Sequence, residues 1–128
     1  MTPTNANAAA DRYLTERVMT ASPAELTAML FDACVGAVKA SVRLFEAGEH
    51  LAAAPRVLKA QDILLELRST LNPAAGEMAV RLDALYTYAY SRLVHANLQR
   101  DVAALREVVE VVEPLQQAWR ESCCTLAA

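Results

Sequence analysis

Three cysteines and two histidines are the residues of this chain best suited to metal binding or nucleophilic chemistry. The cysteines are Cys34, Cys123 and Cys124, and the histidines are His50 and His95. Neighbouring cysteines seldom bond to each other, and no Cys-x-x-Cys pair with partner histidines offers a zinc site. Neither histidine follows a glutamate by three residues, as a di-iron site in a helical bundle requires. We therefore expect no metal and no cofactor, a buried Cys34, and histidines that face solvent.

Sequence motifs for catalysis are missing as well. The chain has no His-Glu-x-x-His, no glycine-rich phosphate loop and no Gly-x-Ser-x-Gly. Glutamates do cluster at Glu107, Glu110 and Glu113. They fall on the outer face of a predicted helix, where a solvated charged surface is the expected arrangement rather than an acid–base pair. The sequence thus argues against an enzyme, and no residue is predicted to be catalytic.

Charge and hydropathy argue against two kinds of partner. The formal net charge is -3 and no run of Lys or Arg stands out, so a surface that follows nucleic-acid phosphates is not expected. The longest apolar runs are far shorter than the ~18 residues that span a bilayer, so no membrane insertion is expected. Residues 1–10 lack the positively charged start of a signal peptide. We expect a cytoplasmic protein.

The composition indicates a small all-α domain. Of 128 residues, 55% are hydrophobic, 26 are Ala and 17 are Leu, while only 3 are Gly and 5 are Pro. Ala and Leu are the best helix formers, and so few Gly and Pro leave little sequence for tight turns. We predict a single domain over 1–128, with an N-terminal cap segment at 1–20 and a loose tail at 122–128.

Apolar residues at three- and four-residue spacing predict four helices within this domain. Ser22 can cap the first, Pro23 suits its first position, and Glu25 completes a capping box. Pro55 predicts either a kink in the second helix or a start near Ala54. The four predicted helices run from Pro23 to Phe45, from Leu51 to Leu71, from Glu77 to Leu98, and from an N-cap at Asp101 to about Glu121. Short connections between helices of this length predict an antiparallel four-helix bundle.

The first predicted helix carries more apolar surface than a bundle needs. One stripe holds Leu26, Leu30, Ala33, Ala37 and Leu44. A second stripe lies about 130° away around the same helix and holds Phe31, Val35, Val38, Val42 and Phe45. The third predicted helix adds Tyr86 and Tyr90 beside its own inner face. Either the bundle buries two sides of the helix, or part of the surplus is a groove for an amphipathic partner segment. The groove hypothesis names Phe31, Val35, Val38, Val42, Phe45, Tyr86, Tyr90 and Val94.

Several motifs resemble the flagellar secretion chaperone family FliS. The segments that carry the resemblance are Tyr13 to Val18, the run Thr20–Leu26, Met29–Asp32, Leu58–Ile63 with Glu66–Leu67, Leu71–Asn72, Leu85–Tyr88, Arg92–Leu93, Ala96–Asn97, Asp101, and Ala118–Trp119. They keep the family's order and spacing over nearly the whole chain. Thr87 stands where the family often has Asp, Ala33 replaces a frequent Gly, and Pro55 and Pro114 are unusual within helices. These departures affect the local geometry of the helices and the choice of the protein that a FliS chaperone binds.

The resemblance implies a cytoplasmic chaperone that binds the disordered C-terminal segment of flagellin. It would prevent premature polymerisation and deliver flagellin to the flagellar type III export gate, with other flagellar regulators as further partners. The N-terminal segment would be a movable cap over the client surface, formed by Tyr13, Leu14, Val18 and Met19. A self-associating structural or regulatory bundle is the alternative from the residues alone, and a metal or redox enzyme is a third.

Overall fold

The computed structural model describes the backbone of residues 4–127 and the side chains of residues 8–122. Over this range the chain is helical and contains no strand, which confirms the all-α prediction. The elements are α1 (Thr4–Thr20), α2 (Pro23–Glu46), α3 (His50–Ser69), the short 3-10 helix η1 (Pro73–Ala75), α4 (Glu77–Gln99) and α5 (Val102–Ala127).

The start of α2 has the predicted Ser22 cap, but the Glu25 carboxylate accepts from the Ser22 hydroxyl instead of from the Ser22 backbone N–H as a capping box requires. The Ser22 side chain accepts a hydrogen bond from the Glu25 backbone N–H at 3.2 Å, and its hydroxyl contacts Glu25 Oε1 at 3.1 Å. Pro23 occupies the first helical position, where no N–H is needed. The Glu25 N–H is one of the backbone donors that the first turn of a helix leaves without a partner inside the helix, and Ser22 supplies that partner.

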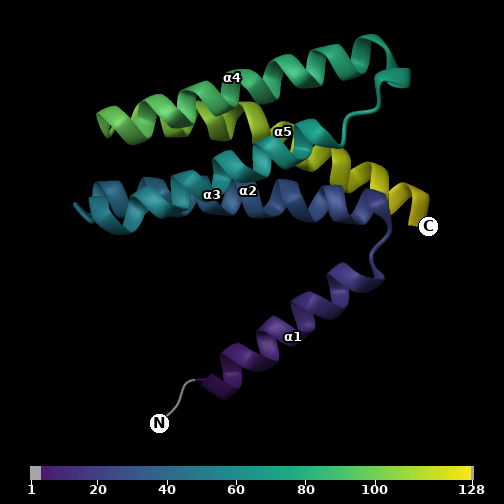
Figure 1. Cartoon of the computed structure of the whole chain (residues 1–128), viewed down its shortest axis with the longest axis horizontal. Coiled ribbons are helices and arrows are strands. Elements are labelled where there is room, and N and C mark those ends of the chain that lie inside the picture. Colours follow the sequence, from purple (N-terminus) through teal and green to yellow (C-terminus); the bar gives the residue numbers. More distant parts are fainter. Residues whose placement is uncertain (1–3, 128) are drawn as a thin grey trace.

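Two tight turns and one left-handed residue reverse the chain between the long helices. Gly48 and Gly76 have φ angles of 78° and 62°, a region that glycine enters without steric cost. Arg100 adopts the left-handed conformation, with φ at 54°, and closes α4. Asp101 Oδ1 then accepts the Ala104 N–H at 3.3 Å, as the predicted N-cap of α5 should. Consecutive helices from α2 to α5 run back and forth as a result (Figure 1).

Helices α2 to α5 surround one core. Helix α2 packs on α3 and α5, and α4 packs on the same two helices. The helix α3 begins at His50, five residues before Pro55, so the alternative of a late start near Ala54 was wrong. The largest fully buried apolar side chains are Phe31, Leu64, Leu67, Leu93, Leu105, Val38, Val57, Val108 and Val112.

The two ends of the chain extend the helical structure beyond the four predicted helices. The predicted N-terminal cap segment is a helix that diverges from the other four (Figure 1). At the other end α5 continues through Ala127, so the predicted loose tail from Ser122 was wrong for the backbone up to that residue. The side chains of Cys123 and Cys124 lie outside the described residues.

Candidate binding surface

Most of the groove predicted from the sequence is core. Five of its residues are between 1% and 6% exposed: Phe31, Val35, Val38, Phe45 and Tyr86. Their assignment to an open groove was therefore wrong. The error has a physical cause, because α2 packs against both α3 and α5 and so buries two sides. A wide apolar arc on a helical wheel cannot show which part of the arc meets these two neighbours.

Aromatic side chains fix this inner face of α2. The Phe31 ring lies 6.2 Å from Tyr86 on α4 and 6.0 Å from Trp119 on α5, both in tilted arrangements. The indole N–H of Trp119 donates to the Ala24 carbonyl at 3.0 Å. These contacts tie the start of α2 to the end of α5, so Phe31 and Tyr86 serve the fold.

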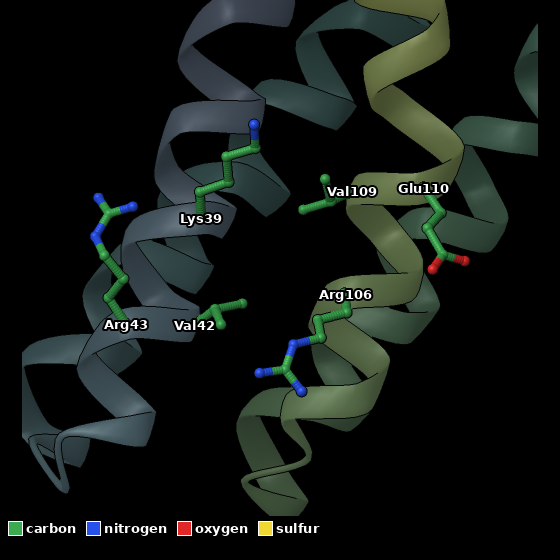
Figure 2. Close-up of a pocket in the computed structure, with 6 residues that line it drawn as sticks. All are labelled: Lys39, Val42, Arg43, Arg106, Val109 and Glu110. Carbon is green, nitrogen blue, oxygen red and sulfur yellow. The ribbon is translucent and has the colours of Figure 1, made fainter.

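The three remaining residues of the predicted groove, Val42, Tyr90 and Val94, are half-buried. Val42 lines a recess between α2 and α5 together with Val109. Figure 2 shows these two valines facing each other, while Arg43 and Glu110 point away. Tyr90 and Val42 also pack against the core. None of the three forms part of a broad apolar surface with the five buried residues.

Ion pairs close the seam between α2 and α5 along its length. Going up α2, Asp32 pairs with Arg120 at 2.5 Å, Lys39 with Glu113 at 2.6 Å, and Glu46 with Arg106. The partners are spaced seven residues apart on both helices, and the sign of the charge alternates from pair to pair. Seven residues make close to two helical turns, so all six side chains lie along one edge. This edge is occupied by contacts within the chain.

A hollow of about 410 Å³ lies between α1, α2 and α3, and we call it the α1–α2 groove. It is lined by Leu14 and Val18 of α1, by Leu26, Met29, Leu30 and Ala33 of α2, and by Glu66 of α3. The α2 residues are half-buried, and Leu14 and Val18 are 51% and 47% exposed. The structure thus places the open apolar surface on the other stripe of α2, which the groove hypothesis did not choose.

The predicted cap residues fall into two groups. Leu14 and Val18 line the α1–α2 groove, whereas Tyr13 and Met19 are 61% and 80% exposed and are not among its lining residues. The cap does not cover the predicted groove residues, because most of these are in the core. No hydrogen bond or ion pair joins the described side chains of α1 to the other helices, so apolar contact alone holds the described part of α1 there.

Small residues continue the exposed face of α2 beyond the groove. Ala33, Gly36 and Ala40 follow one another at three- and four-residue spacing, and a Cβ added at Gly36 would meet nothing within 4 Å. A mid-helix glycine costs stability without a local packing reason here. The sequence signal for this surface was the apolar stripe of Leu26, Leu30 and Ala33. A helical wheel shows this stripe but cannot show whether it faces the other helices or solvent.

Polar groups outside the groove connect α4 to α5. Tyr88 and Arg92 both donate to Glu107 Oε1 at 2.8 Å, and the hydrogen bond to Glu107 raises the pKa of Tyr88. His95 Nε2 lies 3.1 Å from Asp101 Oδ2, so the expected solvated histidine has a partner. The Ala104 N–H, followed by His95, lowers the pKa of Asp101. This network joins neighbouring helices, and none of its side chains is among the lining residues of the α1–α2 groove.

The other chemical candidates are also accounted for by packing. Cys34 is fully buried as expected, and burial raises the pKa of its thiol to about 12. The ring of His50 lies 5.5 Å from Phe45 and its Nδ1 is buried without a partner among the described residues, which corrects its solvated assignment. Within the described part of the chain, no cluster of His, Cys, Asp and Glu could hold a metal ion. The same residues contain no helix long and apolar enough to cross a bilayer.

Comparison with known proteins decides the family. Residues 5–125 match the family described as "Flagellar protein FliS". The flagellar secretion chaperone FliS of Bacillus subtilis (strain 168) is 34% identical over 110 residues, which are 86% of this chain and 82% of that protein. The chain belongs to the FliS family. The FliS of Salmonella typhimurium (strain LT2) is 35% identical over 106 residues, covering 81% and 78% of the two chains.

Membership of the FliS family confirms the resemblance found in the sequence, and it makes the protein a flagellar secretion chaperone and not an enzyme. A solved structure described as "Crystal structure of flagellar chaperone from bacteria" has a TM-score of 0.73 to this chain at 21% identity. The match covers 91% of this chain and 96% of that one. At this identity the likeness supports the FliS-type helical fold alone.

Proposed function

We propose that this FliS-family protein binds the disordered C-terminal segment of flagellin in the cytoplasm. Binding prevents premature polymerisation and presents the client to the flagellar type III export apparatus. The observation that carries the proposal is the α1–α2 groove, an open apolar surface in a family of secretion chaperones. Helices α2 to α5 act as an antiparallel four-helix bundle that supplies the rigid base of this groove.

The lining of the groove suits a segment that folds as it binds. Leu26, Met29 and Leu30 supply flexible apolar side chains, and Ala33 leaves room for a client backbone. A disordered segment loses conformational entropy on ordering, so it needs a large apolar surface to bind at all. An amphipathic client helix can bury its apolar face in this groove without any catalytic group.

Helix α1 has a defined part in this proposal. Leu14 and Val18 already form one wall of the groove, and no polar contact of the described residues fixes α1. Residues Ala21 and Ser22 join it to α2 as a short link. We propose that α1 is the movable cap and that it adjusts its angle to enclose the bound segment. Tyr13 and Met19 then contact the client rather than the bundle.

Calorimetric titration of the C-terminal segment of the organism's own flagellin tests the proposal. We expect saturable 1:1 binding at micromolar protein concentration. Ala33→Glu places a bulky carboxylate in the groove beside Glu66 and should weaken binding at least tenfold. Ala84→Glu is the matched control, since Ala84 is an exposed alanine on α4 and is not among the residues that line the groove. Absence of binding to the unaltered protein would overturn the proposed function, whereas equal binding by both variants would overturn the placement in the groove.

A further inference from the structure

A second apolar cavity lies at the end of the helical body where α2 begins, and we call it the end cavity. Its volume is about 360 Å³. Four parts of the chain meet there: the first turn of α2, the connection from α3 through η1, the first half of α4, and Trp119 of α5. The apolar side chains of its wall are Pro23, Leu71, Met78, Leu82, Tyr86 and Trp119.

The walls of the end cavity are mainly apolar and carry no charged side chain. The Trp119 indole N–H is already engaged with the Ala24 carbonyl. Tyr86 is only 2% exposed. Burial and the Cys34 thiol raise the pKa of Tyr86 to about 12, so the hydroxyl stays protonated near neutral pH. The cavity therefore favours an uncharged, apolar occupant.

Polar groups among the lining residues can hydrogen-bond to both the N–H and the C=O of a peptide. Thr27 and Thr70 donate to the Pro23 and Leu67 carbonyls at 3.1 and 2.7 Å, so their hydroxyl oxygens can still accept. Asn72 accepts the Ala74 N–H at 2.9 Å through Oδ1, which leaves its side-chain N–H groups as donors. A backbone N–H and a backbone C=O next to an apolar side chain would both find partners among these groups.

The end cavity adjoins the α1–α2 groove on two helices. Thr27 of the cavity follows Leu26 of the groove along α2. Thr70 of the cavity caps the C-terminal end of α3, four residues or about one turn beyond Glu66 of the groove. A segment that leaves the groove at this end of the molecule therefore reaches the cavity after roughly one helical turn.

We infer that the end cavity binds one apolar side chain of the client segment, while the flanking peptide groups hydrogen-bond to Thr27, Thr70 and Asn72. The identity of the client rests on the proposed function, but the chemistry of the occupant rests on the cavity. The end cavity is then an anchor at the edge of the α1–α2 groove and fixes where along its length the client sits.

Trp119 gives a direct readout of this inference because it is the only tryptophan of the chain. N-acetyl-leucine methylamide, added at millimolar concentration, should change Trp119 fluorescence and the NMR shift of its indole N–H in a saturable manner. N-acetyl-glycine methylamide, which lacks the side chain, should not. If neither compound affects Trp119, the cavity does not take an apolar side chain and the inference is overturned.

Two neighbouring alanines of η1 provide matched variants for the client itself. Ala75 lines the end cavity and Ala74 does not, and both are exposed. Ala75→Phe should lower flagellin affinity about tenfold and abolish the response to the leucine compound, while Ala74→Phe should change neither by more than twofold. If flagellin binds both variants equally well, the anchor is overturned although the proposed function stands. Flagellin could also fail to bind the unaltered chain while the leucine compound binds it and not the Ala75→Phe variant. That result would overturn the proposed function and support the chemistry inferred for the cavity.

Discussion

The two seams along α2 differ in the contacts that hold them and in the residues that line their hollows. On the side of α5, buried valines and three alternating ion pairs join the helices along their length. On the side of α1, apolar side chains line a hollow of about 410 Å³, and no described polar contact crosses it. The first seam leaves a recess of about 400 Å³ whose lining is mostly charged, with Val42 and Val109 as its apolar residues. The lining of the second is apolar except for Glu66.

The difference shows how one helix can serve both fold and function. The side of α2 that holds Phe31 and Val38 is buried in the core, and the side that holds Met29 and Ala33 lines an open apolar hollow. Substitutions on the two sides should therefore separate stability from client affinity. The predictions below test that separation, beginning with the largest expected effect.

A charge on the inner side of α2 should have the largest effect. Val38 is 1% exposed, so Val38→Asp buries a carboxylate without a partner and should lower the free energy of unfolding by about 4 kcal/mol or more. Urea denaturation followed by circular dichroism measures this change. Val80→Asp is the control, since Val80 is 69% exposed on α4 and should cost about 0.5 kcal/mol or less. Equal effects would place Val38 on a surface.

On the outer side of α2, Gly36→Ala should stabilise the protein by about 1 kcal/mol. Gly36 lies within a long helix, and a Cβ there meets nothing within 4 Å. Thermal and urea denaturation would both detect the gain. A loss of stability would mean that another group already occupies the space above Gly36 and that this face is not open.

The middle ion pair of the α2–α5 seam should have a smaller effect. Lys39→Glu brings two carboxylates together at Glu113 and should cost roughly 0.5 kcal/mol, because both side chains are partly exposed. Adding Glu113→Lys should recover most of the loss, and high salt should reduce it. A double-mutant cycle at low and high ionic strength measures the coupling. Flagellin affinity should stay unchanged, and a clear loss would show that this seam also contacts the client.

Acid should weaken the junction between α4 and α5. The Ala104 N–H and His95 lower the pKa of Asp101 below its unfolded value of about 3.9. The stabilisation is therefore complete above about pH 4 and is lost as pH falls through the lowered folded pKa. Urea midpoints measured between pH 2 and 6 should show this loss, and Asp101→Asn should show a smaller dependence on pH. An identical profile for the variant would exclude Asp101 as a contributor.

Local sequence signals predicted the helices well. The Ser22 cap, Pro23 at the first helical position, the Gly48 turn and the Asp101 cap all act as expected, since each depends on neighbouring residues. The backbone at 122–127 and the start of α3 were less predictable. At both places the length of the helix depends on its packing against neighbouring helices, which helix propensity alone does not predict.

The binding surface was harder to predict than the fold. The sequence correctly showed an apolar surplus on α2, but it could not show that Phe31 and Val35 are buried in the core while Leu26 and Met29 line the hollow beside α1. The orientation of a helix about its own axis is set by tertiary contacts, and both stripes have similar hydrophobicity. The end cavity is built from four separate parts of the chain and had no local signature.

Hydrogen–deuterium exchange of the protein with and without the flagellin segment tests the central claim most directly. In the free protein, amides of 8–20 should exchange much faster than those of α4 and α5, because α1 has few tertiary contacts to protect it. In the complex, residues 8–20 and 26–33 should gain the largest protection, while 102–112 should change little. Protection confined to α4 and α5, with 8–20 and 26–33 unchanged, would contradict the assignment of the open face of α2 as the client surface.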